Sequence, residues 1–370
     1  MQIDKYINPV ALLRHIEDGY VRGVDHPTLS LSLLSYARKT VYENLWDDVT
    51  IRTRGLIYDN ISGAVIARPF EKFFNADALF INSEDYDRPV FQDKLDGSLG
   101  IFWRYGGHWG IASKGSFTSP HATWMTGWMS QHIEEYGELV WPEGYTPLFE
   151  MIAESVQTHV LNYSGIEDLV LIALVKIETG EELNTLSLES YAKRNHLHTP
   201  AVYNMTLSAS MALDREDHEG FVATYSRFDG KPPLKLKVKH PTFLKKQKLV
   251  HGVSPANTLK LLANEDHAAL ETLQMHLPQH ILTRVRDWVE CYVASYRYIH
   301  VTATVLMHEI LKNLTTRKEA AEFLTKPENK PYAGICFLML DQDEGAYQQA
   351  IWKLVGERVH IESTPMEEEN

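Results

Sequence analysis

Lys94-Leu95-Asp96-Gly97-Ser98 is the stretch around which this chain is organised. Apolar residues that favour β structure lie on both sides of it, at 89–91 and 99–103. Asp-Gly is a strong hairpin-turn pair, so the stretch predicts a tight turn between two strands that presents Lys94 as a nucleophile. By itself the motif Lys-x-Asp-Gly is weak evidence for a nucleophile. Roughly one random chain of this length in ten contains it, mostly in solvated turns.

Two glutamates further along the chain lie in or next to predicted strands. Glu150 is inside the apolar run 148–153, and Glu219 directly precedes the run 220–225. Burying a carboxylate without a partner is costly, so we expect a cation or a ligand hydroxyl beside Glu150. The alternative is an edge strand on which Glu150 faces water.

Alternating lysines mark a third segment, a predicted strand at 234–238 that is followed by Lys239. Alternate residues of a strand share a face, so Lys235, Lys237 and Lys239 would form a row of ammonium groups over an apolar underside. Such a row suits phosphates. The competing interpretation is a solvated edge strand protected by lysines. Either Lys235 with Lys237 or Lys237 with Lys239 could be the functional pair, and we favour the second.

Two more lysines precede or follow predicted strands. A strand pair is expected at 53–58 and 64–68, and Phe70-Glu71-Lys72-Phe73-Phe74 comes directly after it. These phenylalanines could equally be core and Lys72 a surface residue. A strand at 109–113 would deliver Lys114 to its end, one hairpin away from Lys94.

Composition limits the class of protein. The 370 residues are 44% hydrophobic and 23% charged, as in a soluble globular protein with room for two domains. No apolar run reaches the roughly 20 residues of a membrane span, and the polar N-terminus does not resemble a signal peptide. Cys291 and Cys336 lack the spacing of a zinc site, so we expect two buried thiols in a reducing cytoplasm.

Charge is distributed unevenly along the chain. The net charge of −13 argues against a general polyanion-binding surface. The sequence ends in an acidic segment at 367–369, which we expect to be frayed. Seven lysines nevertheless cluster in one segment: Lys231, Lys235, Lys237, Lys239, Lys245, Lys246 and Lys248.

The pattern changes after residue 250. Ser254-Pro255 and Pro278 favour helix starts, helical spacing runs from 281 to 299, and Thr316 to Glu319 fits a capping box. The sequence therefore predicts an α+β chain of two domains. Residues 1–250 would form antiparallel sheets with flanking helices, and residues 251–370 an all-helical domain.

One chemistry accounts for the order of these segments, namely attack of a lysine amine on a nucleoside triphosphate. A free lysine has a pKa near ~10.4 and must lose its proton before it can attack phosphorus. Charge then builds on the α-phosphate and on pyrophosphate, which requires lysines and Mg²⁺ together. Asp96 and Glu219 are the carboxylates that could hold the metal, directly or through water.

These residues resemble the motifs of the covalent nucleotidyltransferases, the superfamily of polynucleotide ligases and mRNA capping enzymes. Arg54-Gly55, Glu71 to Asn75 and Ser113 to Ser116 narrow the resemblance to RNA ligases of the phage T4 RNA ligase 1 type. The matching segments cover roughly residues 35–245. In chain order the five motifs are Lys94-x-Asp96-Gly97, Ser113-Lys114-Gly115, Phe149-Glu150, Glu219-Gly220 and Lys237-x-Lys239.

The resemblance implies an ATP-dependent RNA ligase that joins a 5′-phosphate to a 3′-hydroxyl through lysyl-AMP and RNA-adenylate, in RNA repair. Its cofactors would be ATP and Mg²⁺ or Mn²⁺, and its partners single-stranded or nicked RNA ends, with tRNA a candidate. It further implies a monomer in the cytoplasm, that of the host if a bacteriophage encodes it. The roles implied are Lys94 as nucleophile, Lys237 and Lys239 as phosphate-neutralising catalytic residues, and Arg54, Lys72, Asp96, Gly97, Lys114, Glu150 and Glu219 in nucleotide binding.

Two rival functions follow from the same residues. DNA ligases and capping enzymes usually carry an OB-type barrel after the lysine motif, and the helical pattern after residue 254 argues against one. A non-catalytic RNA-binding module with a decayed nucleotide pocket is the other rival. The intact Lys94 argues against it.

Overall fold

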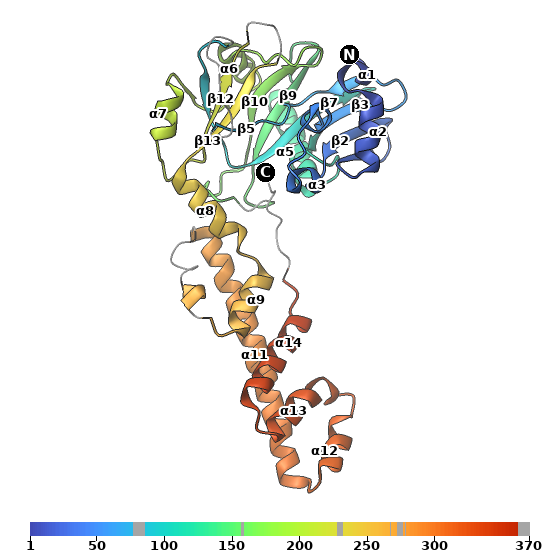
Figure 1. Cartoon of the computed structure of the whole chain (residues 1–370), viewed down its shortest axis with the longest axis vertical. Coiled ribbons are helices and arrows are strands. Elements are labelled where there is room, and N and C mark those ends of the chain that lie inside the picture. The colour runs from blue at the N-terminus through green and yellow to red at the C-terminus, as the bar shows by residue number, and fades with distance from the viewer. Residues whose placement is uncertain are drawn as a thin grey trace. The chain divides into compact units, whose positions relative to one another are not determined.

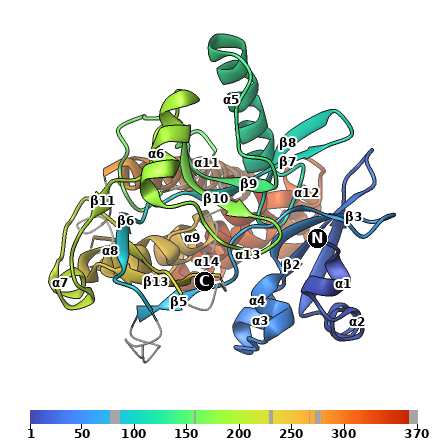
Figure 2. The ribbon, with the colours of Figure 1, turned by 90° about the horizontal axis from the view of Figure 1, so that it is seen from above.

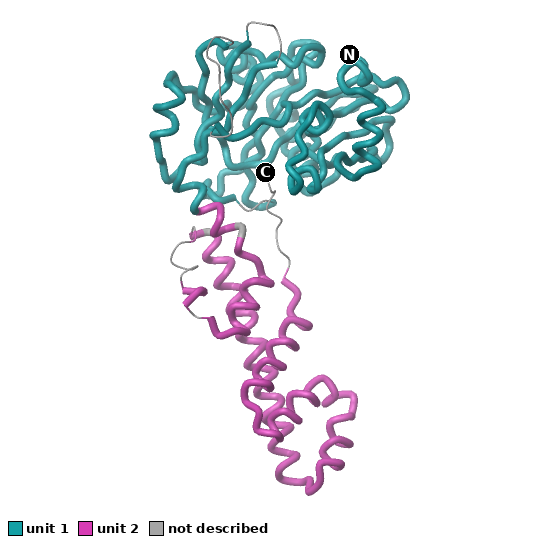
Figure 3. The backbone as a smooth tube through the Cα atoms, viewed as in Figure 1, with its two compact units in different colours: residues 1–245, 365–370 teal, residues 246–364 magenta. Residues whose placement is uncertain are grey.

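The computed structural model describes residues 1–76, 86–156, 159–227, 232–266, 268–271, 277 and 279–361. Lys231, the predicted helix start at Pro278 and the acidic residues 367–369 lie outside this part. The chain forms two compact units that divide between Lys245 and Lys246 (Figure 3).

Three sheets build the first unit (Figure 1). The first has the order β1-β2-β3-β4, the second β10-β9-β7-β8, and the third β11-β6-β12-β13-β5. Neighbouring strands pair antiparallel, except that β5 runs parallel to β13. The strands are β1 (Val21–Asp25), β2 (Leu31–Tyr36), β3 (Arg54–Asp59), β4 (Val65–Ala67), β5 (Phe74–Asn75), β6 (Val90–Asp93), β7 (Ser98–Tyr105), β8 (His108–Ser113), β9 (Tyr145–Ile152), β10 (Asp168–Lys176), β11 (Val202–Tyr203), β12 (Gly220–Tyr225) and β13 (Leu234–Lys239).

Helices flank these sheets and begin at capping residues. Asn8 and Ser119 accept hydrogen bonds from the free amides at the starts of α2 and α5, each of which has proline at its first turn. The helices of this unit are α1 (Ile3–Tyr6), α2 (Pro9–Glu17), α3 (Arg38–Tyr42), α4 (Asp48–Arg52), α5 (Pro120–Tyr136), α6 (Thr185–Arg194) and α7 (Leu207–Ala212), and α8 (Pro241–His251) crosses the boundary between the units.

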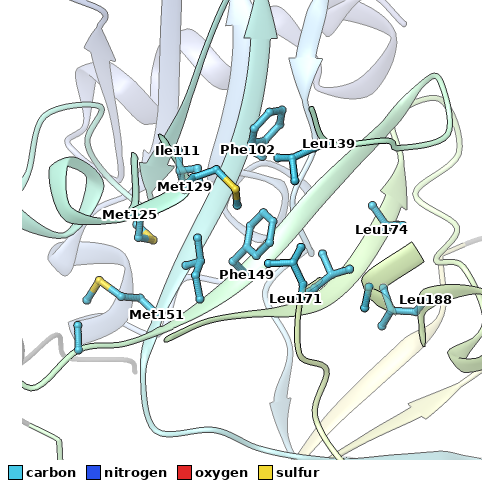
Figure 4. Packing of buried hydrophobic residues seen from close by; sticks show 14 residues of the cluster. Phe102, Ile111, Met125, Met129, Leu139, Phe149, Met151, Leu171, Leu174 and Leu188 are labelled. Atoms are coloured by element: carbon cyan, nitrogen blue, oxygen red, sulfur yellow. The ribbon is translucent and has the colours of Figure 1, made fainter. Parts of the chain in front are cut away.

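The second sheet carries the largest core of this unit. Figure 2 shows α5 along the β7–β8 hairpin and α6 beside β10, in agreement with the contacts between these elements. Met125 and Met129 of α5 and Leu188 of α6 pack on Phe149 of β9 and Leu171 of β10 (Figure 4). All five are at most 3% exposed, so burial of apolar area holds the central strands in place.

The Lys94 stretch joins two different sheets. It leaves β6, which pairs with β11 and β12, and enters β7, which pairs with β8 and β9. The stretch does lie between two strands, as predicted, but β6 and β7 do not pair with each other. The physical reason is that Val90–Asp93 finds its hydrogen-bond partners in β12 from much later in the chain. The predicted hairpin between Lys94 and Lys114 is confirmed, because β7 pairs with β8.

The second unit is helical. Its elements are α9 (Pro255–Ala263), α11 (Gln279–Asn313), α12 (Arg317–Leu324), a 3₁₀ turn (Lys330–Tyr332), α13 (Ala333–Leu340) and α14 (Glu344–Arg358). Ser254 caps α9, and the predicted capping box of Thr316 and Glu319 opens α12. Cys336 lies in the core of this unit, whereas Cys291 is exposed, so the expectation of two buried thiols is wrong for Cys291.

These observations confirm the predicted α+β class, with antiparallel sheets followed by a helical region. The predicted strands at 53–58, 64–68, 109–113 and 234–238 are also confirmed. Among the described residues, no helix combines the length and the apolar character that crossing a membrane requires.

Candidate active site

The end of β6 brings Lys94 beside the start of β12. Asp93 pairs with Phe221, and the Lys94 amide donates to the Gly220 carbonyl oxygen at 2.9 Å. Gly220 has φ +140°, and a Cβ there would lie 2.0 Å from the Val238 carbonyl oxygen. Glycine is therefore required where the strands approach this closely, and the geometry sets Glu219 next to Lys94.

Glu219 bridges two lysines. Its Oε2 accepts from Lys94 Nζ at 2.9 Å, and its Oε1 accepts from Lys239 Nζ at 2.9 Å. All three side chains are at most 10% exposed. Ion pairs as buried as these are screened little by solvent, and the group keeps one excess positive charge when all three are ionised. Such a group suits an anion.

Glu150 is inside the protein, which excludes the alternative of a solvated edge strand. β9 lies between β10 and β7, and Glu150 is 7% exposed. Its Oε1 accepts a hydrogen bond from the Gly97 amide at 3.1 Å. A Cβ at Gly97 would lie 2.3 Å from the Met151 carbonyl oxygen, so only glycine lets the Lys94 stretch approach β9 this closely.

Asp96 anchors the stretch rather than pointing its carboxylate at Lys94. Its Oδ2 accepts from the amides of Val160 and Leu161 at 2.6 and 2.8 Å, and its own amide donates to the Tyr163 hydroxyl at 2.8 Å. The Ala153 amide donates to His159 Nε2, so His159 carries its proton on Nδ1 and donates it to the Asp96 carbonyl oxygen. Burial, followed by the charge of Glu219, raises the pKa of Asp96 to about 7.

This raised pKa predicts a pH-dependent stability. Between the ordinary value of 3.8 and about 7 the folded protein binds the proton more tightly, so the free energy of unfolding falls as pH rises through this interval. Asp96→Asn cannot ionise. From pH 5 to pH 8 we expect the free energy of unfolding, measured in urea, to fall by about 2 kcal/mol more in the unsubstituted protein than in this variant. Asp48→Asn, at a side chain 90% exposed, is the control; equal losses for Asp96→Asn and the unsubstituted protein would contradict the prediction.

A cavity adjoins Lys94, with an aromatic pair on its wall. Phe70 and Phe73 meet edge to face at 6.2 Å between ring centroids. The Arg54 guanidinium lies 5.5 Å and Lys237 Nζ 5.2 Å from the centroid of Phe73. The residues that line this cavity include Arg54, Phe70, Phe73, Gln92, Lys94, Leu99, Glu150, Ile172, Val222 and Lys235.

Lys72 and Lys114 share one aromatic ring. Tyr36, 7% exposed, lies 5.7 Å from Lys72 Nζ and 5.0 Å from Lys114 Nζ, measured to its ring centroid. Lys72 also lies 4.8 Å from the Trp46 ring and 5.8 Å from the Phe74 ring. Lys72 is therefore held in an aromatic box and is not a plain surface residue. Lys72 also lines a neighbouring cavity of about 370 Å³, which shares Phe70, Phe73 and Lys235 with the first.

The alternating lysines of β13 lie on one face of the strand. Leu236 and Val238 pack into the core under the third sheet, while the three lysines contact Glu182, Phe73 and Glu219 on the other side. Because Lys235 and Lys237 are buried, the Lys239 side chain is only 10% exposed and β13 lies between β12 and β5, the solvated edge strand is excluded.

The structure thus joins Lys94, Glu219 and Lys239 in one chain of contacts. Arg54 and Glu150 line the cavity, and Gly97 is held by Glu150. Lys72 and Lys114 meet at Tyr36. The Asp96 carboxylate accepts hydrogen bonds from backbone amides. Within the described part of the chain, no group of three or more His, Cys, Asp or Glu side chains could hold a metal ion. Glu219 alone, with substrate phosphates and water as further ligands, fits the way proteins bind Mg²⁺.

Sequence reasoning missed Tyr36 and Trp46, which hold Lys72 and Lys114, and Glu182, which pairs with Lys235. No motif marks them. Tyr36 and Trp46 are two of the five tyrosine and tryptophan residues in the first fifty, so composition did not single them out.

Comparison with known proteins finds RNA ligases. The profile of the RNA ligase family, T4 ligase 1 type, matches residues 52–243. An inferred bifunctional polynucleotide kinase/RNA ligase of Autographa californica nuclear polyhedrosis virus is 36% identical over 78 residues, which are 18% of this chain and 11% of that protein. The chain thus matches only about a tenth of the length of this relative.

Solved structures of Naegleria gruberi RNA ligase are also similar. An arginine-to-alanine variant with ATP and manganese has 19% identity and a TM-score of 0.38, covering 62% of this chain and 76% of that one. A glutamate-to-alanine variant with AMP and manganese has 16% identity and a TM-score of 0.37, covering 64% and 82%.

Proposed function

The chain belongs to the RNA ligase family of the T4 ligase 1 type, and on that premise we propose that it is an ATP-dependent RNA ligase that joins 5′-phosphate and 3′-hydroxyl ends. The observation that carries the proposal is the buried contact chain Lys94–Glu219–Lys239 beside the aromatic cavity. It combines an amine nucleophile, a carboxylate and a second cation in a site that suits a nucleotide.

Three steps follow from this proposal. The Lys94 amine attacks the α-phosphorus of ATP, an N–P bond forms and pyrophosphate leaves. The 5′-phosphate oxygen of RNA then attacks the lysyl-AMP, which frees Lys94 and gives RNA-adenylate. Finally the 3′-hydroxyl of the other end attacks the activated 5′-phosphorus, and AMP leaves.

The contacts suggest a role for each neighbour of Lys94. Glu219 Oε2, 2.9 Å from Lys94 Nζ, is within reach to take the proton that the amine loses. Lys239 and Lys237 would neutralise phosphate charge, with Lys72 and Lys114 extending the cationic lining. Glu150, which holds Gly97, would also orient the nucleoside. Mg²⁺ or Mn²⁺ bound by Glu219 and phosphates would supply further charge neutralisation.

RNA ends, with tRNA one candidate, are the proposed partners, and the helical unit is proposed to present them to the first unit. We further propose that the protein is a monomer, that it works in the cytoplasm and that it takes part in RNA repair. No residue of the helical unit carries a nucleotide motif, so its part concerns the polynucleotide rather than ATP.

Matched RNA and DNA oligonucleotides with 5′-phosphates, supplied with ATP and Mg²⁺, test the substrate. We expect joined or circular single-stranded RNA on a sizing gel, and DNA sealed at least about tenfold more slowly, as expected where the site makes contacts to the 2′-hydroxyl. DNA sealed as fast as RNA would contradict the RNA assignment. A protein that forms no covalent adduct with α-labelled ATP would instead be a binding module.

A further inference from the structure

Lys235 lines the cavity beside Lys94, and three groups of the protein hold its ammonium. Its Nζ donates to Glu182 Oε2 at 2.6 Å and to Thr224 Oγ1 at 3.1 Å, and it lies 4.3 Å from the centroid of the Phe70 ring. The Lys235 side chain is 6% exposed and that of Glu182 is 13% exposed. Two oxygens and one aromatic face thus account for the three N–H donors of the ammonium group.

These contacts link three segments that are far apart in the chain. Glu182 follows β10, which it joins through a bridge to Val175, Thr224 lies on β12, and Phe70 precedes β5. Thr224 pairs directly with Lys235 across β12 and β13, so the hydroxyl and the ammonium are neighbours on one sheet face. Phe70 alone among these partners belongs to the cavity beside Lys94.

We propose that Lys235 is a positioning residue that fixes the Phe70 ring as the wall on which the nucleobase stacks, and that it does not bind phosphate. The inference rests on the proposed function, because it takes the cavity beside Lys94 as the nucleotide site. Lys235 supports one face of Phe70, and Phe73 packs on it edge to face, so two neighbours restrain the ring. A restrained aromatic wall binds a base with little loss of conformational entropy.

Lys239 also has a carboxylate and an aromatic ring as partners, Glu219 and Phe243, the latter 5.4 Å from its Nζ, but they lie elsewhere in the site. Lys239 shares the carboxylate of Glu219 with Lys94, at the point where phosphate chemistry would take place. Lys235 instead pairs with Glu182, and its ammonium rests on Phe70, a ring that lines the cavity beside Lys94. Two lysines on the same face of one strand therefore serve different parts of one nucleotide: Lys235 the base and Lys239 the phosphates.

The test compares ATP with adenosine, which lacks phosphates. Binding of each is measured by calorimetry in the Lys94→Ala background, where no adduct can form. We expect Lys235→Met to weaken both ligands by the same factor, about ten- to thirtyfold, the order expected for loss of a desolvated cation–π contact. In chains that retain Lys94, the rate of adduct formation at saturating ATP should stay within about twofold, since the chemical step is untouched.

Three further variants complete the design. Lys176→Met is the matched control, because Lys176 pairs with Glu181 at 3.9 Å and is 42% exposed, and it should change neither affinity. Lys235→Met with Glu182→Leu avoids leaving a buried carboxylate alone, and it carries the test if the single variant does not fold. Glu182→Gln keeps a hydrogen-bond acceptor for Lys235 and should weaken both ligands less than Lys235→Met.

The outcomes separate this inference from the proposed function. Weaker ATP binding with unchanged adenosine binding would make Lys235 a phosphate contact and overturn the inference, as would unchanged affinities for both. Failure of the chain to form any lysyl-AMP, with both affinities still falling together in Lys235→Met, would count against the ligase proposal and leave the positioning role supported.

Discussion

Replacing Lys94 with alanine should abolish the covalent adduct that we expect the protein to form with ATP. No other group can form the same phosphoramidate at that position, so we expect the rate of adduct formation to fall by a factor on the order of 10⁴ or more, as for the loss of other covalent nucleophiles. Incubation with α-labelled ATP, followed by denaturing electrophoresis, measures the adduct. Its lability in acid identifies the N–P bond.

Two features make this variant informative. Glu219 keeps its ion pair with Lys239 after Lys94 is removed, so the buried carboxylate is not left alone and we expect the fold to survive. Lys94→Arg should fail as well, because a guanidinium stays protonated and is a poor nucleophile. Lys176→Ala, at an exposed lysine, should label normally. Label that persists in a folded Lys94→Ala protein would move the nucleophile elsewhere.

Much of this site could be predicted from sequence because its signals are local. Alternation along 234–239 placed three lysines on one face, and an apolar run around Glu150 required a buried partner for that carboxylate. The start of β12 after Glu219 was equally visible as a strand-like run behind a turn. Each of these features depends on residues within a few positions of one another.

Features that depend on distant pairing were not predictable. The Asp-Gly pair indicates a turn, but whether the next strand folds back or enters another sheet depends on β12, more than a hundred residues later. The same holds for Asp96, since the backbone amides that donate to its carboxylate belong to Val160 and Leu161. Sequence suggested Asp96 as a metal ligand; the hydrogen bonds favour an anchoring role.

The aromatic partners of the cations form a second class of unpredicted feature. Tyr36 and Trp46 come from the first fifty residues, and neither stands in a motif. An aromatic ring beside a lysine has no fixed spacing in sequence, because the contact is made across elements. Glu182, the partner of Lys235, was not predictable either. It follows β10 after a turn, where an acidic residue would ordinarily be solvated.

Replacing Lys239 with alanine should slow the first step far more than the last. Lys239 and Lys94 now share Glu219, each 2.9 Å from one of its oxygens. Without Lys239, Glu219 would attract Lys94 alone, and a tighter pair keeps the ammonium protonated and unreactive. The cation that would stabilise the departing pyrophosphate is also lost. Together these effects cost about 2 to 4 kcal/mol, roughly thirty- to a thousandfold in rate, by analogy with loss of one oxyanion donor.

The final joining step does not use the Lys94 amine as a nucleophile. RNA that already carries a 5′-adenylate enters at that step, so Lys239→Ala should retain a larger share of activity on it than on 5′-phosphate RNA with ATP. Lys235→Ala should be milder than Lys239→Ala in both assays at saturating substrate, because its loss affects base binding. Equal losses for Lys239→Ala in the two assays would remove the assignment to the first step. A harsher Lys235→Ala would shift the functional lysine pair by two residues, to Lys235 and Lys237.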